Sequence, residues 1–204
     1  MTINDSDYIN YKKLTMKKGW IILIKKEMTK MWLETNFTSV TILEFPEQQL
    51  LRIKSKESDG YEAAVVSSKS GKNSKLFEFR LDEGNNLGSE AGEISAGVLE
   101  GVELVSFTGT SKGKGYAGGI KRYGLHGMPA THGHKFTRHL GSKGNRKPRR
   151  TQKGHPHAGH MGMETVTVKN IKIVNTFDHE GKHFVVVKGS IPGRYNGMLK
   201  CYFQ

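Results

Sequence analysis

The sequence predicts a mainly β protein, a small barrel or sandwich that is interrupted by one long basic insertion. Short runs of β-branched and aromatic residues recur, with turn signals roughly every 8–12 residues. These strand signals stop after residue 108 and resume near residue 164, and residues 109–161 contain 12 glycines and only scattered apolar residues. The 204 residues are enough for one core of roughly 120–140 residues.

The part of the chain before the insertion supplies six predicted strands, each bounded by polar breaks. They are residues 20–25, 38–45, 49–54, 62–67, 76–81 and 102–108. The run LFEFRL at residues 76–81 does not alternate cleanly, so its buried face cannot be read from the pattern. Residues 67–74 and 83–97 are rich in Gly, Ser, Asn or Lys and are predicted to be loops. The polar residues 1–18 show no periodicity and predict a flexible tail.

The part after the insertion predicts further strands in the same style. Residues 164–174 alternate between polar and apolar side chains, and residues 184–187 form a compact β-branched run. Between them, Asp178 and Gly181 predict a hairpin turn within residues 177–182. Residues 190–197 are predicted to be a loop, and residues 198–203 a last short strand.

The net charge of +13 is concentrated in the insertion, residues 109–161. This stretch holds 12 of the 32 Lys and Arg residues, and no Asp or Glu occurs between Glu103 and Glu164. The rest of the chain carries 20 basic and 19 acidic residues, so it is almost neutral. One-sided charge of this kind predicts a polyanionic partner, most often a nucleic acid.

Composition also excludes several classes of protein. No apolar run approaches the roughly 20 residues of a membrane-spanning helix, and the longest covers only residues 20–24. The single cysteine, Cys201, excludes an internal disulfide and a cysteine-rich zinc module. The N-terminus lacks an apolar signal core, so the default expectation is a cytoplasmic protein.

Two glycine motifs at the start of the insertion resemble nucleotide-binding loops. Residues 113–118 read GKGYAG and match G-x-G-x-x-G, but no helical pattern follows and no acidic residue appears for another 40 positions. Residues 109–114 are one residue too short for a phosphate-binding Walker loop, and Gly115 stands where Ser or Thr should hold magnesium. Neither motif therefore predicts a nucleotide site.

Seven histidines lie in the insertion, and residues 155–160 read HPHAGH. A zinc site needs four ligands and usually includes Cys or a carboxylate, neither of which lies near. A Ser/His/Asp catalytic set is unsupported for the same reason, because no carboxylate can orient an imidazole. We therefore interpret these rings as groups that stack on bases or donate to phosphates.

The densest charge run, KGNRKPRRTQK at residues 143–153, is typical of a peptide that threads into folded RNA. A solvated surface normally mixes both signs of charge, and this run does not. Its glycines let the backbone approach phosphates closely, while Tyr116, Tyr123 and Phe136 supply stacking surfaces at intervals. No helix-turn-helix, zinc-finger or RNA-recognition-motif signature is present, so sequence-specific reading of DNA is not expected.

Several motifs, in order along the chain, resemble the universal ribosomal protein L-three family of the large subunit, in its bacterial or organellar form. The motifs are DGY (59–61), FEFR (77–80), TGTSKGKGYAG (108–118), PATHG (129–133), GSKG (141–144), KG (153–154) followed by AGHMG (158–162), ETVTVKN (164–170) and VKGSIPG (187–193). The resemblance extends from about residue 19 to residue 199, and its ordered motifs are far more specific than a single G-x-G-x-x-G.

The resemblance implies a split six-stranded β-barrel of the translation-protein type, with residues 109–161 as an extension that penetrates rRNA toward the peptidyl-transferase region. It implies a structural constituent of the large subunit that binds rRNA directly and helps to nucleate assembly, and not an enzyme. The expected partners are rRNA and neighbouring large-subunit proteins, with no membrane and no small-molecule substrate. No cofactor is expected beyond rRNA-associated magnesium, and the expected location is the cytoplasmic ribosome rather than an organellar one.

Together, these arguments predict a tail (1–18), a globular barrel (19–108 and 162–204) and an rRNA-penetrating extension (109–161). The predicted rRNA contacts are Lys112, Lys114, Tyr116, Lys121, Arg122, His132, His134, Lys135, Arg138, His139, Lys143, Asn145, Arg146, Lys147, Arg149, Arg150, Lys153, His155, His157 and His160. No catalytic or metal-binding residue is predicted.

The chain departs from the family pattern near the middle of the insertion. Asn145 stands where many bacterial members carry a methylated glutamine, so that modification is expected to be absent, and Lys143 replaces an isoleucine and adds charge. Residues 1–18 have no family counterpart. From the residues alone, two other classes of protein stay open: an architectural nucleic-acid-binding protein or RNA chaperone outside the ribosome, and a His-rich metal-binding protein.

Overall fold

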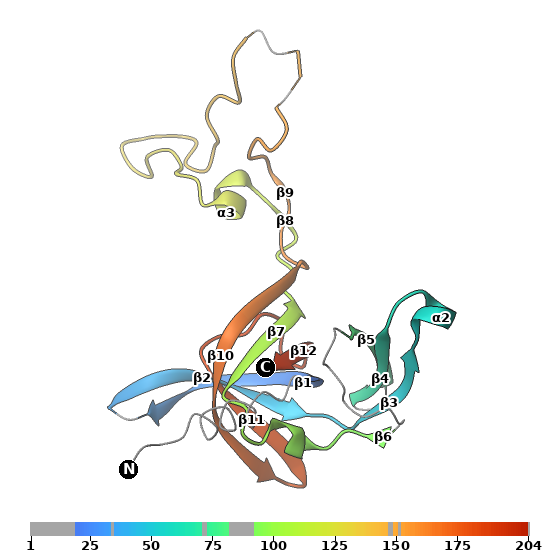
Figure 1. Ribbon diagram of the computed structural model, residues 1–204. Helices are drawn as coiled ribbons and strands as arrows, with labels where there is room; N and C mark the ends of the chain where they lie inside the picture. Colours follow the sequence, from blue (N-terminus) through green and yellow to red (C-terminus); the bar gives the residue numbers. More distant parts are fainter. Residues whose placement is uncertain are drawn as a thin grey trace, which may run out of the picture. The chain divides into compact units, whose positions relative to one another are not determined.

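The computed structural model describes residues 19–33, 35–70, 73–81, 92–146, 149–150 and 152–203. The chain forms two compact units, and each is described by itself (Figure 1). We call the unit before Ser111 and after Glu164 the body, and Ser111–Glu164 the insertion unit. The predicted tail and most of the predicted loop 83–97 lie outside the described residues. The mainly β class is confirmed, because strands dominate the described chain.

Six strands of the body close into a barrel in which every strand pairs antiparallel with its neighbours. In order around the barrel they are β1 (Gly19–Leu33), β12 (Met198–Phe203), β7 (Leu104–Thr110), β10 (Thr165–His179), β11 (Lys182–Lys188) and β2 (Asn36–Phe45). Three of these strands precede the insertion unit in the chain and three follow it. The barrel therefore depends on both sides of the insertion.

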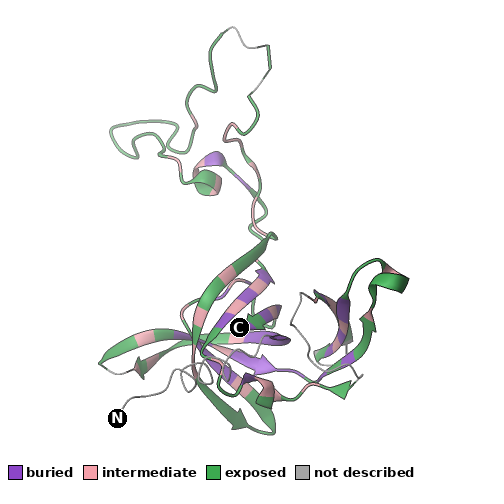
Figure 2. Cartoon of the chain, viewed as in Figure 1, coloured by how far each residue is buried: buried purple, intermediate pink, exposed green. Residues whose placement is uncertain are grey.

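The barrel interior is built from alternate residues of its strands, as strand geometry requires. Ile21 and Leu23 of β1 and Phe107 of β7 belong to one core cluster and are almost fully buried. Figure 2 colours the buried parts of the barrel strands purple. Cys201 lies among them on β12, and burial raises the pKa of its thiol. The cysteine therefore serves as a small apolar core residue and not as a reactive group.

The opposite face of β1 is covered by a second sheet, which explains the continuous apolar run at residues 20–24. This sheet has the strand order β5 (Asn73–Arg80), β4 (Ala63–Ser70), β3 (Gln48–Lys54) and β6 (Gly92–Glu93). Trp20 stacks on Phe79 with ring centroids 4.4 Å apart, and Ile22 packs beside Val66. A strand that is buried on both faces has no polar side to show in the sequence.

Gln48 occupies the gap where β2 has turned away from β1. Its side-chain amide accepts a hydrogen bond from the Ile22 N–H at 3.0 Å and donates one to the Ile22 carbonyl at 3.2 Å. The Gln48 side chain is buried, and it provides hydrogen-bond partners for the N–H and the carbonyl of Ile22, which are not paired with β2. It thus joins the second sheet to the barrel.

The structure corrects the prediction of a loop at residues 67–74. The hairpin ladder continues through this stretch, with Ser67 opposite Leu76 and Lys69 opposite Ser74, and only residues 71 and 72 lie outside the description. Backbone pairing tolerates these polar side chains, and Lys69 is held by Glu47 through a backbone hydrogen bond and an ion pair at 3.1 Å. The irregular run 76–81 buries Phe79 and exposes Leu76.

The predicted hairpin turn within residues 177–182 is confirmed, but the turn is shorter than predicted because the two strands continue into this range. β10 ends at His179 and β11 begins at Lys182, so Glu180 and Gly181 alone form the turn. Both have positive φ values, 51° and 72°, which is the conformation of a type I′ turn.

The helices of the described chain are short: α2 (Lys56–Asp59), the 3₁₀ turn Ala96–Leu99 and α3 (Gly119–Tyr123). Within the described residues, none of them has the length and apolar character that a membrane-crossing helix needs.

Candidate nucleic-acid interface

The insertion unit begins and ends in a narrow antiparallel stem. β8 (Tyr116–Ala117) pairs with β9 (Gly159–His160). Below this pair, the Lys114 N–H donates to the Met161 carbonyl at 2.9 Å, and the Met161 N–H donates to the Gly115 carbonyl at 3.0 Å. The Ser111 N–H also donates to the Glu164 carbonyl at 2.9 Å, so the two ends of the unit are held together.

Gly162 allows the two chains of the stem to approach closely. Its φ is +79°, and a Cβ atom there would lie 2.1 Å from the Lys112 carbonyl oxygen. No larger residue fits without separating the chains. The glycine-rich sequence is therefore a requirement of the stem, in addition to its value for contacts with phosphate.

The stem leads into α3, which corrects the expectation that no helix follows the G-x-G-x-x-G motif. The helix has five residues and ends at Gly124, whose φ is +66°. It is too short to show a hydrophobic period in the sequence. The motif is still no dinucleotide site, because the strand before the helix, β8, has two residues and pairs antiparallel, unlike the parallel strands of that fold.

Beyond α3 the described unit has almost no interior, as Figure 2 shows. Only Ala117 and Gly119 are buried among its described residues. Leu140 packs against Gly119, where a Cβ atom would lie 2.4 Å from the Leu140 Cδ1 atom. Arg122 donates to the His157 carbonyl at 3.2 Å and thereby links α3 to the returning chain.

Most of the predicted contact residues are exposed on this unit. The exposed ones are Lys112, Lys114, Tyr116, Lys121, His132, His134, Lys135, Arg138, His139, Lys143, Asn145, Arg146, Arg149, Arg150, Lys153 and His160. Arg122, His155 and His157 are half-buried, and Lys147 lies outside the described residues. Tyr116 is 80% exposed, so its ring is free to stack on a partner.

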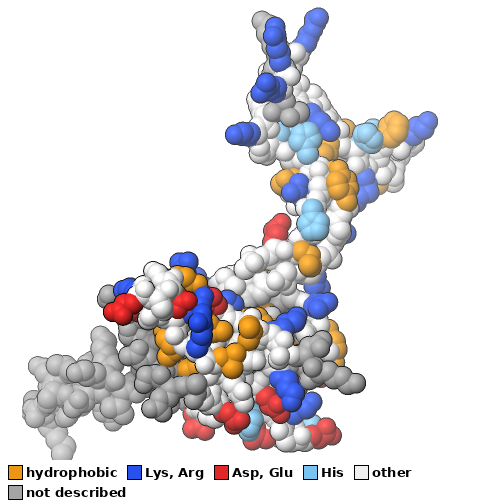
Figure 3. All heavy atoms as spheres, turned by 90° about the vertical axis from the view of Figure 1, so that its right-hand side faces the viewer, with side chains coloured by type: hydrophobic (Ala, Val, Ile, Leu, Met, Phe, Trp, Pro, Cys, Tyr) orange, Lys and Arg blue, Asp and Glu red, His pale blue; other side chains and the backbone are white. Residues whose placement is uncertain are grey.

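The cations of the insertion unit have no carboxylate partner within the described part of the chain. No ion pair joins any of its described Lys or Arg residues to an acidic group, and Glu164 is the unit's one acidic residue. Figure 3 shows blue Lys and Arg and pale blue His side chains over this unit, whereas blue and red mix on the body. Unpaired cations of this kind are free to replace the counterions of a polyanion.

The body neutralises its own charges. Glu44 pairs with Lys26 at 2.6 Å and with Lys182 at 3.1 Å. Burial of the Glu44 carboxyl opposes its ionisation, but the two ammonium groups outweigh that effect and hold its pKa below the usual value. Lys54 and Glu78 form another pair at 2.9 Å.

The histidines contact other rings and do not gather into a metal centre. The rings of His155 and His157 lie 5.3 Å apart, and His139 meets the edge of Phe136 at 5.1 Å. In the described part of the chain, no group of three or more His, Cys, Asp or Glu side chains is placed to hold a metal ion. The Nε2 atom of His157 is buried and has no hydrogen-bond partner among the described residues.

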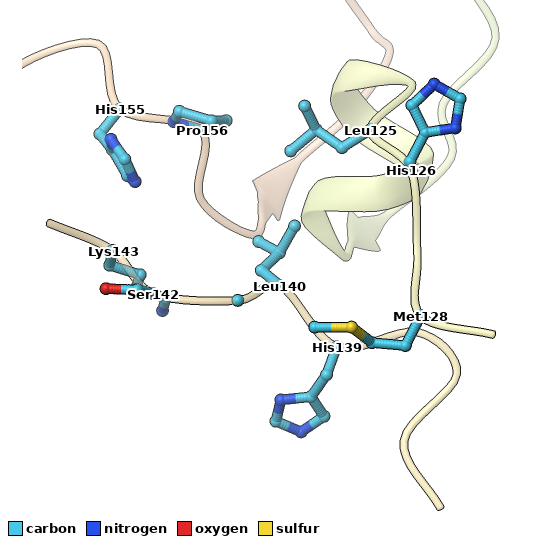
Figure 4. A pocket seen from close by; sticks show the side chains of 10 residues that line it. Leu125, His126, Met128, His139, Leu140, Ser142, Lys143, His155 and Pro156 are labelled. Carbon is cyan, nitrogen blue, oxygen red and sulfur yellow. The ribbon is translucent and has the colours of Figure 1, made fainter. Parts of the chain in front are cut away.

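The unit also brings together residues that the sequence did not associate (Figure 4). Three segments surround a hollow of about 290 Å³, namely the chain after α3, the chain around Leu140 and the chain before β9. His139, Lys143 and His155 are predicted contact residues that line it. His126 lines it as well, although it is not among the predicted contacts. No sequence signal could have joined these segments, because the unit has no periodic pattern.

Comparison with known proteins decides the family. The model of the family described as Ribosomal protein L3 matches residues 13–183 of the chain. The expectation that residues 1–18 have no family counterpart is therefore wrong for residues 13–18. The chain belongs to the ribosomal protein L3 family. Members of this family are structural, non-enzymatic constituents of the ribosome, and the family-level expectation of the sequence is confirmed.

Bacterial L3 proteins resemble the chain over most of its length. The "Large ribosomal subunit protein uL3" of Pasteurella multocida is 37% identical over 195 residues, which covers 85% of this chain and 92% of the relative. The protein of the same name from Bdellovibrio bacteriovorus is 36% identical and covers 91% and 93%, respectively. The Borrelia hermsii protein is 37% identical and covers 76% and 81%.

Proposed function

We propose that this L3 family member is a structural constituent of the large ribosomal subunit that binds rRNA directly through its insertion unit. The observation that carries the proposal is a unit of 54 residues with 12 Lys and Arg residues and one acidic residue. All of its described cations except Arg122 are exposed, and none has a carboxylate partner among the described residues, as expected for a surface that is completed by phosphates.

The mechanism is charge neutralisation together with a fit to the shape of folded rRNA. Phosphate contacts dominate the affinity, and the backbone at glycines approaches the RNA where side chains would not fit. The predicted contact residues carry these roles, and the deepest contacts fall within residues 132–150. Lys112, Lys114 and Tyr116 act at the stem.

The finer features follow from the family resemblance. The six-stranded barrel is of the translation-protein type and docks on the rRNA surface. Residues 109–161 serve as the extension, which reaches toward the peptidyl-transferase centre and becomes fully ordered on binding. The protein helps to nucleate subunit assembly beside neighbouring large-subunit proteins, in the cytoplasmic ribosome, with no cofactor beyond rRNA-associated magnesium.

Sedimentation of the tagged chain tests the ribosomal role. We expect it to co-migrate with large subunits in a gradient at high salt. A protein that washes off under these conditions is an RNA chaperone or another architectural protein, and that outcome would overturn the proposal.

Deletion of residues 127–154 tests which unit binds. We expect the body to stay folded, because its strands and core lie outside the deletion, while most of the rRNA affinity and its salt dependence disappear. Circular dichroism and filter binding to large-subunit rRNA measure the two effects. Unchanged binding would show that the insertion unit is not the binding element.

A further inference from the structure

The hollow in the insertion unit has the chemistry of a binding site. Its apolar lining comes from Leu125, Met128, Leu140 and Pro156, which belong to three segments of the chain. His126, His139, His155 and Lys143 line it as well, and of the three imidazole rings that of His155 turns toward the hollow, whereas those of His126 and His139 point away from it (Figure 4). An apolar floor with a few polar groups at the edge is typical of a site for a small planar ligand.

We propose that this hollow receives a single unstacked nucleobase of the bound RNA. The proposal rests on the proposed function and names the part of the RNA that the unit recognises. At about 290 Å³, the hollow lies at the lower end of the range for small-ligand sites, which suits one base better than a stacked pair.

The lining favours a base over a phosphate or a metal ion. A phosphate needs several converging N–H donors, whereas the floor here is hydrocarbon and a thioether. A metal ion needs a ligand cluster, and the described residues contain none. A nucleobase has two apolar faces and a polar edge, and His side chains are among the aromatic groups on which splayed-out RNA bases stack.

The rim supplies a partner for the phosphate of the same nucleotide. Lys143 lines the hollow and has no carboxylate partner among the described residues. The Ser142 hydroxyl instead donates to the Gly144 carbonyl at 3.2 Å, which holds the chain beside Lys143 in a turn. We assign base contact to the apolar floor and the His155 ring, and phosphate contact to Lys143.

The test uses the full chain and two RNA hairpins that differ only by one bulged 2-aminopurine. We expect the wild-type protein to bind the bulged hairpin about tenfold more tightly than the fully paired one, in line with the contribution of one stacked base. The fluorescence of the 2-aminopurine should change on binding, since the base leaves one stack and enters another environment.

Gly141→Leu fills the hollow with little strain on the fold. A Cβ atom at Gly141 would meet only the Met128 Cε atom, at 3.8 Å, which is an ordinary contact. We expect this variant to lose the tenfold preference and to keep the salt dependence. Gly118→Leu is the matched control, because Gly118 has open space around it and does not line the hollow.

A second pair of variants keeps the test informative if Gly141→Leu fails to fold. We expect His155→Ala to weaken the preference for the bulged hairpin and His155→Tyr to restore it through its ring. If wild type and all variants bind both hairpins equally, the nucleobase site is refuted while RNA binding stands. If neither hairpin binds, the proposed function itself has failed.

Discussion

The body and the insertion unit differ in how far their side chains are buried and in whether their charged side chains are paired. In the body, residues 19–25 of β1 are buried on both faces and the carboxylate of Glu44 is shared by two lysines. In the insertion unit, only Ala117 and Gly119 are buried among the described residues, and the described cations lack acidic partners. Apolar burial is therefore concentrated in the body, and exposed cations without acidic partners in the insertion unit.

The largest difference between the two units is expected when a phenylalanine is replaced by alanine in each of them. We expect Phe107→Ala to lower the free energy of unfolding by about 3–5 kcal/mol, because the ring is fully buried in the barrel. Phe136→Ala, at a ring that is 55% exposed, should change it by less than about 0.5 kcal/mol. Urea denaturation of both variants measures the difference, and equal losses would refute the division of roles.

The stem gives a second test, this time of local order in the insertion unit. We expect Gly162→Ala to open the stem, since its Cβ atom would collide with the Lys112 carbonyl and its φ is positive. Gly115→Ala is the control: its φ is also positive, but no atom lies near, so only about 1–2 kcal/mol of left-handed strain applies. Hydrogen exchange of the Lys114 amide should be much faster in the Gly162 variant, and equal rates would contradict the collision argument.

Charge removal sharpens the comparison on the binding side. Replacing Arg149 and Arg150 by Gln should lower the slope of log affinity against log salt by about 1–2, because each lost phosphate contact releases about one counterion fewer. The same charge change at Lys69 and Lys75 in the body should leave the slope unaltered. Fluorescence anisotropy with rRNA fragments, repeated over a salt series, provides the measurement.

The smallest expected effect concerns acid stability of the body. Because the folded pKa of Glu44 is lowered, its stabilising contribution is present above the unfolded value of 4.5 and is lost as the pH falls through the folded pKa. Lys182 is more than half exposed, so solvent screening keeps the contribution below about 1 kcal/mol. Glu44→Gln should flatten the curve of unfolding free energy against pH below pH 4.5.

Much of the body could be predicted from the sequence because burial leaves a pattern there. The run at residues 20–24 and the alternation in residues 164–174 both became strands, and Gly181 marked its turn. The outer parts of β1 and β10 were missed because they form hairpins that extend into solvent and have no buried stripe. Polar strands such as Ser67–Ser70 leave no signal, since their pairing is made by the backbone.

The insertion unit shows the converse. Its charge followed from composition, and its nucleic-acid partner stays a prediction from that charge, because electrostatic attraction depends on which residues are present more than on their order. The meeting of His126, His139 and His155 around one hollow could not be predicted, since they come from three irregular segments. The short helix α3 could not be predicted for a related reason, because five residues are too few to show the helical repeat of apolar residues.

The position of the insertion unit in the chain also determines the order in which the barrel strands are synthesised. Strands β10, β11 and β12 all follow Glu164, so β7 lacks both of its neighbours until the 54 residues of the insertion unit have been translated. At about 5–20 residues per second, that interval lasts roughly 3–10 s. The whole basic unit is thus synthesised before any of the three strands that complete the barrel.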